Sequence, residues 1–166
     1  MPQGPFRFRV IRFLMTPLRY ADFQFRVIWH DRDVIQLCVS AWNGTFGGTA
    51  EIYEAIGDLE KAAAKLRGFP RSPSDRREIT FGNFDRKCAG GGVKMRFHCI
   101  DNAGHAWVET IIDSNHESGG TLQTVLLSMA LEATAIDTFV QELCTVGENR
   151  AGTAHLKGLD WPDTTH

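Results

Sequence analysis

The chain has 166 residues with a net charge of −2; 43% of the residues are hydrophobic and 23% are charged. These values are typical of a soluble globular domain, and they favour neither a disordered chain nor a basic nucleic-acid-binding protein. No stretch approaches the roughly 18 consecutive apolar residues of a membrane-spanning helix, and nothing marks the chain for export. We therefore expect a cytoplasmic protein with no nucleic-acid or membrane partner.

Residue periodicity predicts an α+β fold, mostly antiparallel β-sheet with two short helices. Apolar and polar residues alternate with the period of two that is typical of a half-buried strand. This pattern predicts about eight strands, at 6–14, 23–30, 35–41, 49–54, 78–81, 93–100, 105–113 and 122–131. Helical spacing predicts helices over 58–67, with Asp58 as N-cap, and over 135–146, with Gly147 as the stop.

The domain organisation follows from these elements. Residues 1–146 are expected to form a single domain, because the polar loop at 71–77 is too short to require two. Residues 147–166 are expected to be a polar C-terminal tail that docks through Trp161.

The two helices share a register at an offset of 77 residues, so that each half reads as about four strands closed by one helix. The pairs are Leu59 with Ile136, Ala62 with Phe139, Ala63 with Val140 and Leu66 with Leu143. An internal duplication predicts this pattern, and shared helical periodicity alone also accounts for it.

Charge is divided unevenly along the chain. Residues 1–100 carry 16 Lys/Arg and 10 Asp/Glu, a net charge of +6, whereas residues 101–166 carry 2 and 10, a net charge of −8. One interpretation is that the two halves neutralise each other in the fold. The other is an acidic binding face that includes Glu109, Asp113 and Glu117, because carboxylates steer association with a basic protein partner.

Residues 101–105 form a good hairpin turn, and two strand registers are compatible with it. One register places Phe97 opposite Glu109. The other places His98 opposite Glu109 and divides apolar from polar faces more cleanly. A His beside a carboxylate is the minimum for general acid–base catalysis, so His98 and Glu109 are the candidate catalytic pair; an ordinary solvent-facing strand pair is the alternative.

The cysteines and glycines give little support for a cofactor. Four cysteines lie at 38, 88, 99 and 144 without the paired short spacing of a zinc site, so reduced thiols and no metal are expected. The run Gly90-Gly91-Gly92 precedes a strand rather than a helix. Phosphate binding needs a helix N-terminus at that position, and no cofactor is therefore predicted.

The order of landmarks between residues 45 and 146 resembles small uncharacterised bacterial proteins of the WapI-like immunity type and related domains of unknown function. The matching features are Tyr53 leading into Asp58-Leu59, the strand that begins Gly104-His105-Ala106-Trp107-Val108, and a final strand that passes into the helix 136–143. The resemblance implies a non-enzymatic protein that binds and blocks a toxin, and it assigns no functional residues.

Three functional hypotheses follow. The first is a protein-binding module, an immunity protein that neutralises a cognate toxin. The second is a small enzyme or ligand-binding protein that uses His98 and Glu109. The third is a self-associating structural protein, a homo-oligomer whose partly apolar strands pair between subunits.

Overall fold

The computed structural model describes residues 21–115 and 123–159. This part of the chain forms two four-stranded antiparallel sheets and two helices, which confirms the predicted α+β fold. The elements in chain order are β1 (Asp22–His30), β2 (Val34–Trp42), β3 (Gly47–Ala55), α1 (Asp58–Leu66), β4 (Arg76–Gly82), β5 (Gly92–Cys99), β6 (Ala106–Ser114), β7 (Gln123–Leu131), α2 (Ala133–Asn149) and β8 (Thr153–Lys157).

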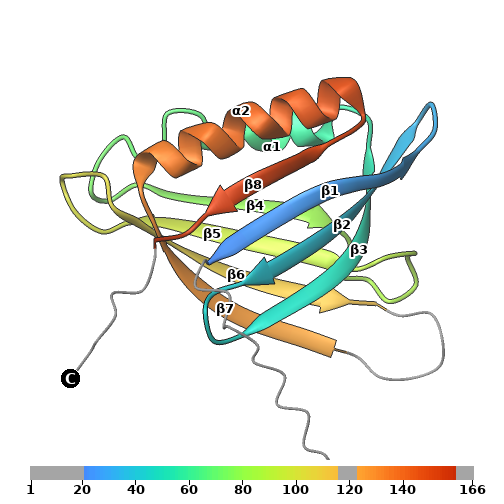
Figure 1. Ribbon diagram of the computed structural model, residues 1–166, viewed down its shortest axis with the longest axis horizontal. Coiled ribbons are helices and arrows are strands. Elements are labelled where there is room, and N and C mark those ends of the chain that lie inside the picture. Colours follow the sequence, from blue (N-terminus) through green and yellow to red (C-terminus); the bar gives the residue numbers. More distant parts are fainter. Residues whose placement is uncertain (1–20, 116–122, 160–166) are drawn as a thin grey trace, which may run out of the picture.

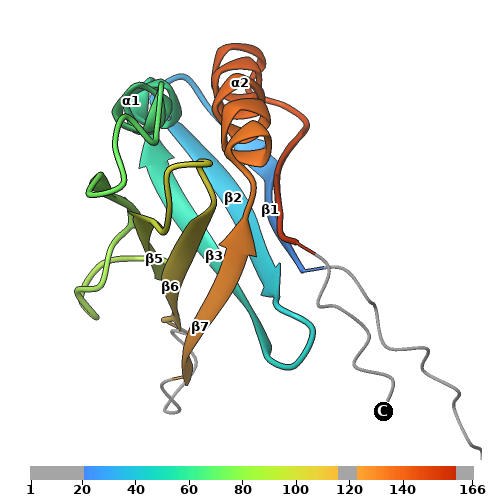
Figure 2. The same ribbon diagram turned by 90° about the vertical axis from the view of Figure 1, so that its left-hand side faces the viewer.

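The first sheet has the order β3-β2-β1-β8, and the second has the order β4-β5-β6-β7. The helices lie side by side above the two sheets, as the two perpendicular views show (Figures 1 and 2). Helix α2 packs along β8 and α1 contacts β4, which are edge strands of the first and the second sheet. The described strands alternate buried and more exposed residues, except that β1 does so only up to its bulge after Val27, so each sheet turns one face inward. The core lies between these inner faces and beneath the helices.

Strands β1–β7 lie where alternation predicts them, whereas the predicted strand at 6–14 lies outside the described residues. The C-terminal prediction needs correction, because residues 147–166 are not simply a polar tail. Helix α2 continues through Gly147 to Asn149, and residues 153–157 form β8 beside β1. Trp161 lies outside the described residues.

The predicted start of α1 and the predicted end of α2 were each wrong by one or a few residues. Asp58 is the first residue of α1, and the N-cap is Gly57, which has a φ of 94°. Gly147 does not stop α2, because it is buried against Glu60 of α1, where a Cβ atom would lie 2.6 Å from the carboxyl group. A glycine at this position serves close helix packing rather than helix termination.

Phe25 joins the three layers of the core. Its ring lies 4.8 Å from that of Phe81 in β4 and 5.4 Å from that of Phe139 in α2, measured between centroids. All three side chains are fully buried. The first sheet, the second sheet and α2 are therefore held at one aromatic contact, the kind of pair that adds about 0.5–1.5 kcal/mol to its area burial.

We expect Phe25→Ala to lower the free energy of unfolding by about 3–5 kcal/mol, because it empties a ring-sized volume at this junction. Phe46→Ala is the matched control, since Phe46 is 63% exposed and its loss should change stability by less than about 0.5 kcal/mol. Urea denaturation measures both. Equal effects of the two substitutions would contradict the described core.

Glu54 links the two sheets near the start of α1. The backbone N–H of Gly82, at the end of β4, donates to the Glu54 carboxyl, and the Asp58 carboxyl lies within hydrogen-bonding reach of it. Burial, followed by the nearby Asp58 charge, raises the pKa of Glu54 to about 7 from 4.5. The protonated form of Glu54 therefore persists in the folded protein up to near neutral pH, well above the range in which a free glutamate ionises.

This raised pKa predicts a pH-dependent stability. Because the folded-state pKa lies above the unfolded value, the contribution of Glu54 is fully present below pH 4.5 and is lost as the pH rises through about 7. The loss is on the order of 2–3 kcal/mol. We expect Glu54→Gln to flatten the fall in unfolding free energy over this range, whereas Glu51→Gln on the same strand leaves it unchanged. An undiminished slope in Glu54→Gln would rule out this role.

Candidate functional site

Strand β8 builds the candidate site, because the chain returns from α2 to the edge of the first sheet. Every second residue of β8 directs its backbone N–H and C=O toward β1. The Val27 N–H donates to the Gly152 carbonyl and the Gly158 N–H donates to the Ala21 carbonyl, so residues 152 and 158 belong to this set. The backbone groups of Ala154 and Leu156, two residues inward from each, therefore also point toward β1. The backbone groups of His155 therefore point away from β1, toward α2.

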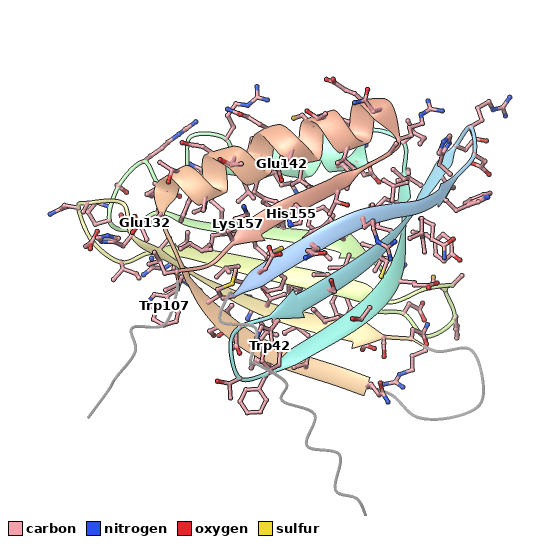
Figure 3. The ribbon with its side chains drawn as sticks, in the orientation of Figure 1. Trp42, Trp107, Glu132, Glu142, His155 and Lys157 are labelled. Carbon is pink, nitrogen blue, oxygen red and sulfur yellow. The ribbon has the colours of Figure 1, made fainter. Side chains whose placement is uncertain are left out.

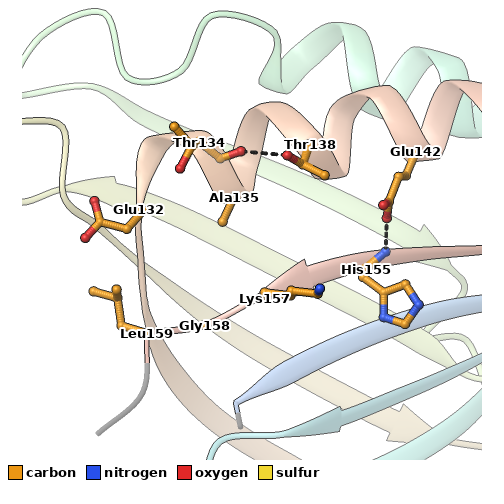
Figure 4. A pocket seen from close by; sticks show the side chains of 9 residues that line it. All are labelled: Glu132, Thr134, Ala135, Thr138, Glu142, His155, Lys157, Gly158 and Leu159. Atoms are coloured by element: carbon orange, nitrogen blue, oxygen red, sulfur yellow. Dashed lines mark hydrogen bonds between the residues drawn. The ribbon is translucent and has the colours of Figure 1, made fainter. Parts of the chain in front are cut away.

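Glu142 of α2 covers this free edge. Its Oε2 accepts the backbone N–H of His155 at 2.6 Å (Figure 4). A carboxylate that accepts an edge N–H satisfies a donor that β8 would otherwise leave open to strand pairing. The contact also sets the separation between α2 and β8 at this point.

Toward the start of α2, the helix and β8 enclose a pocket of about 340 Å³, which we call the polar pocket. Figures 3 and 4 show its charged side chains along the two elements. The residues that give it its character are Glu132, Thr134, Thr138, Glu142, His155 and Lys157, and Leu159 forms one wall. Behind it, Nδ1 of His155 lies 3.3 Å from Oδ2 of Asp22. Carboxylates therefore outnumber the single ammonium group.

A second pocket, which we call the apolar pocket, has a volume of about 420 Å³ and also uses Leu159 as a wall. Its apolar lining comes from the residue before β1, the β2–β3 turn, β6, β7 and the segment after β8: Ala21, Phe46, Trp107, Met129, Ala130 and Leu159. Because Leu159 is common to both, the two pockets adjoin.

Local hydrogen bonds hold the walls of the apolar pocket. Asn43 shapes the β2–β3 turn, because its Oδ1 accepts the N–H groups of Thr45 and Phe46 at 3.0 and 2.8 Å. Its Nδ2 donates to the Ser128 carbonyl of β7 at 3.1 Å. The N–H of Leu159 donates to the Ala130 carbonyl at 2.8 Å. The exposed aromatic ring of Phe46 is thus carried on a turn that is fastened to the other sheet.

His105 follows the β5–β6 turn and lies close in space to Glu132, the residue before α2, which lines the polar pocket. Its Nδ1 is 2.6 Å from Oδ2 of Asp101, and its Nε2 is 3.6 Å from Oε1 of Glu132. The hydrogen bond with Asp101 and then the two carboxylate charges raise the pKa of His105, and the same hydrogen bond lowers the pKa of Asp101. His105 therefore connects the β5–β6 turn with the residue that precedes α2.

The predicted pair His98 and Glu109 does not form. The two residues share the outer face of the second sheet, but the register pairs His98 with Trp107 and Glu109 with Arg96, so both predicted registers were wrong. The reason lies in the turn, where the Ile100 N–H bonds to the His105 carbonyl at 2.8 Å and closes a different loop from either prediction. Arg96 lies 3.4 Å from Glu109 and 2.8 Å from Glu78.

The predicted acidic face is also changed by this geometry. Glu109 lies beside a cation, and Asp113 lies on the same face opposite Gly92, while Glu117 is outside the described residues. Carboxylates without a nearby basic residue in the sequence occur on α2, which has Asp137, Glu142 and Glu148 and no Lys or Arg over 133–149. The lack of Lys and Arg in that helix is a sequence signal that could have found these carboxylates, but the prediction did not use it.

Other sequence features have structural roles. Gly91 allows a close backbone approach, since a Cβ atom there would lie 2.0 Å from the Asp113 carbonyl oxygen, and its N–H bonds to the Glu51 carbonyl at 2.7 Å. The four cysteines are free thiols. Within residues 21–115 and 123–159, no group of three or more His, Cys, Asp or Glu is placed to hold a metal ion, and neither helix there is long and apolar enough to cross a membrane.

Comparison with known proteins gave no match to a family model, to a curated protein or to a solved structure. The two pockets are therefore the features of the described structure that bear on function.

We expect Glu142→Ala to free the edge of β8, because the substitution leaves the His155 N–H without its acceptor. A lost hydrogen bond to a charged group corresponds to about 1.5–3 kcal/mol of stability, reduced here by partial exposure. Amide hydrogen exchange should show faster exchange at His155, with Gln141→Ala as the matched control on the exposed side of α2. Glu142→Gln should restore most of the protection, and slow exchange in the alanine variant would contradict the assigned contact.

Proposed function

We propose that the protein is a non-enzymatic protein-binding module, an immunity-type protein that neutralises a cognate toxin by binding it. The observation that carries the proposal is the apolar pocket with its exposed rim. Phe46 is 63% exposed and Trp107 is 38% exposed, and both contribute to one concave surface. Exposed aromatic side chains around a hollow are typical of the centre of a protein interface.

The charged groups around the apolar pocket support a basic partner. The adjoining polar pocket contributes Glu132 and Glu142, and α2 beside it carries no Lys or Arg. An apolar centre with a charged rim is the usual anatomy of a protein–protein interface, and complementary charge accelerates association. We expect the partner to be basic for this reason.

The tryptophans provide the sharpest test of this proposal. Trp107→Ala should weaken binding to the protein encoded by the neighbouring reading frame by about 2 kcal/mol or more, roughly 30-fold, because it removes an aromatic wall of the apolar pocket. Trp29→Ala is the matched control, since Trp29 is also exposed but does not line this pocket. Its substitution should change the affinity by less than about threefold.

Isothermal titration calorimetry at low and high salt measures both affinities. The affinity of the unmodified chain should fall as salt rises, because charge complementarity is screened. Unchanged binding in Trp107→Ala would exclude the apolar pocket as the interface. A neighbouring product that does not bind at all, together with the lack of any stoichiometric partner in the native cell, would overturn the immunity assignment.

A second candidate function is small-ligand binding or catalysis in the polar pocket. The supporting observation is that His155 has a carboxylate partner, Asp22, at 3.3 Å and lies in a real pocket with Glu142 and Lys157. These residues take the place of His98 and Glu109 in the enzyme hypothesis. Saturable heat release with a small metabolite, abolished by His155→Ala, would favour this function over protein binding.

Self-association is a third candidate, and the outer edge of the second sheet favours it. Strand β7 contains no charged residue over nine positions, and Leu126 is 60% exposed. Because the Ser128 and Ala130 carbonyls already accept from Asn43 and Leu159, pairing between chains would use the part of β7 before Ser128. Uncharged edge strands are the ones that pair between chains. Light scattering of the full chain decides this case: a monomeric mass would end it.

A further inference from the structure

The two pockets lie on either side of one residue and differ in chemistry. Leu159 lines both, the apolar pocket has aromatic and aliphatic walls, and the polar pocket has two glutamates. The chain between them is fixed, because Gly158 N–H donates to the Ala21 carbonyl and Leu159 N–H to the Ala130 carbonyl, both at 2.8 Å. A short segment that crosses Leu159 would meet both pockets.

We infer that the surface across Leu159 recognises a short segment of the partner that places one large apolar side chain in the apolar pocket and one Lys or Arg side chain in the polar pocket. This inference rests on the proposed protein-binding function and specifies the partner's chemistry. It differs from a general acidic surface, because it requires both side chains to be close together in the partner.

The apolar half of this inference follows from size and lining. A volume of about 420 Å³ admits a Leu, Phe or Trp side chain, and Phe46, Trp107 and Leu159 provide contacts from three separate elements. The walls are fastened by the Asn43 and Leu159 hydrogen bonds, so little ordering is needed on binding. Preformed apolar pockets of this kind hold the anchor residue of an interface.

The basic half follows from the charges around the polar pocket. Glu132 and Glu142 line it and Asp22 lies behind His155, whereas Lys157 is its one ammonium group. Carboxylates therefore exceed the one lysine charge, and His105 beside Glu132 adds positive charge only when it is protonated. Among the described residues, Glu142 uses its Oε2 to accept the His155 N–H, and Glu132 uses its Oε1 to contact His105 at 3.6 Å. A carboxylate has two oxygens that can accept hydrogen bonds from a guanidinium or ammonium group.

Two substitutions in the polar pocket should change the affinity for a basic ligand in opposite directions. Glu132→Gln removes a carboxylate from the polar pocket and should weaken a basic ligand by about three- to tenfold. Lys157→Gln removes the one ammonium group and should strengthen the same ligand by a similar factor. Neither side chain is buried in the core, so both variants should remain folded.

Synthetic peptides test this inference with the full ¹⁵N-labelled chain. The probes are acetylated, amidated peptides with a Trp followed one, two or three positions later by Arg, in a Gly/Ser background. Two matched controls replace Arg by Glu or Trp by Gly. Amide chemical shifts should change at residues 44–46, 107, 130–134 and 157–159 for at least one Trp/Arg spacing, and both controls should bind at least about tenfold more weakly.

Each outcome decides the inference. Equal binding of the Arg and Glu peptides, the same sign for Glu132→Gln and Lys157→Gln, shifts elsewhere on the surface, or no shifts up to the solubility limit would each overturn it. The proposed function is tested separately by the loss of partner binding in Trp107→Ala. If Trp107→Ala loses partner binding but the unmodified chain binds none of the peptides, the apolar pocket remains the protein interface and the two-side-chain motif is rejected.

Discussion

The candidate site depends on the pairing of β8 with β1. This five-residue strand brings the chain from the end of α2 to the edge of the first sheet and then across to β7. The bond from His155 N–H to Glu142 holds the strand beside α2, and the bond from Leu159 N–H to Ala130 fastens the following segment to the second sheet. Both pockets are formed by this path, so its loss would remove their common wall.

The two sheets have the same arrangement once β8 is included. Strands β8, β1, β2 and β3 are followed by α1, as β4, β5, β6 and β7 are followed by α2. The helix pairs at an offset of 77 residues are all buried, which an internal duplication and shared helical periodicity both predict. The arrangements differ because the first sheet takes its outer strand from the C-terminal side of the chain. The return of the chain from α2 to the edge of the first sheet leaves a pocket between α2 and β8.

Sequence periodicity was a good guide to the described strands β1–β7 and the two helices, because local alternation reports which face is buried. Strand β8 was missed because only Ala154 and Leu156 are apolar in a short polar stretch, and its pairing partner is more than a hundred residues away. The pockets were missed for the same reason, since long-range pairing creates them.

The central claim is that the surface across Leu159 binds a protein partner. Amide hydrogen exchange of the full chain, with and without the bound partner, tests it most directly. We expect slower exchange on binding at residues 43–46, 107, 128–134 and 157–159. Protection confined to the outer face of β4 and β5, with these residues unchanged, would contradict it.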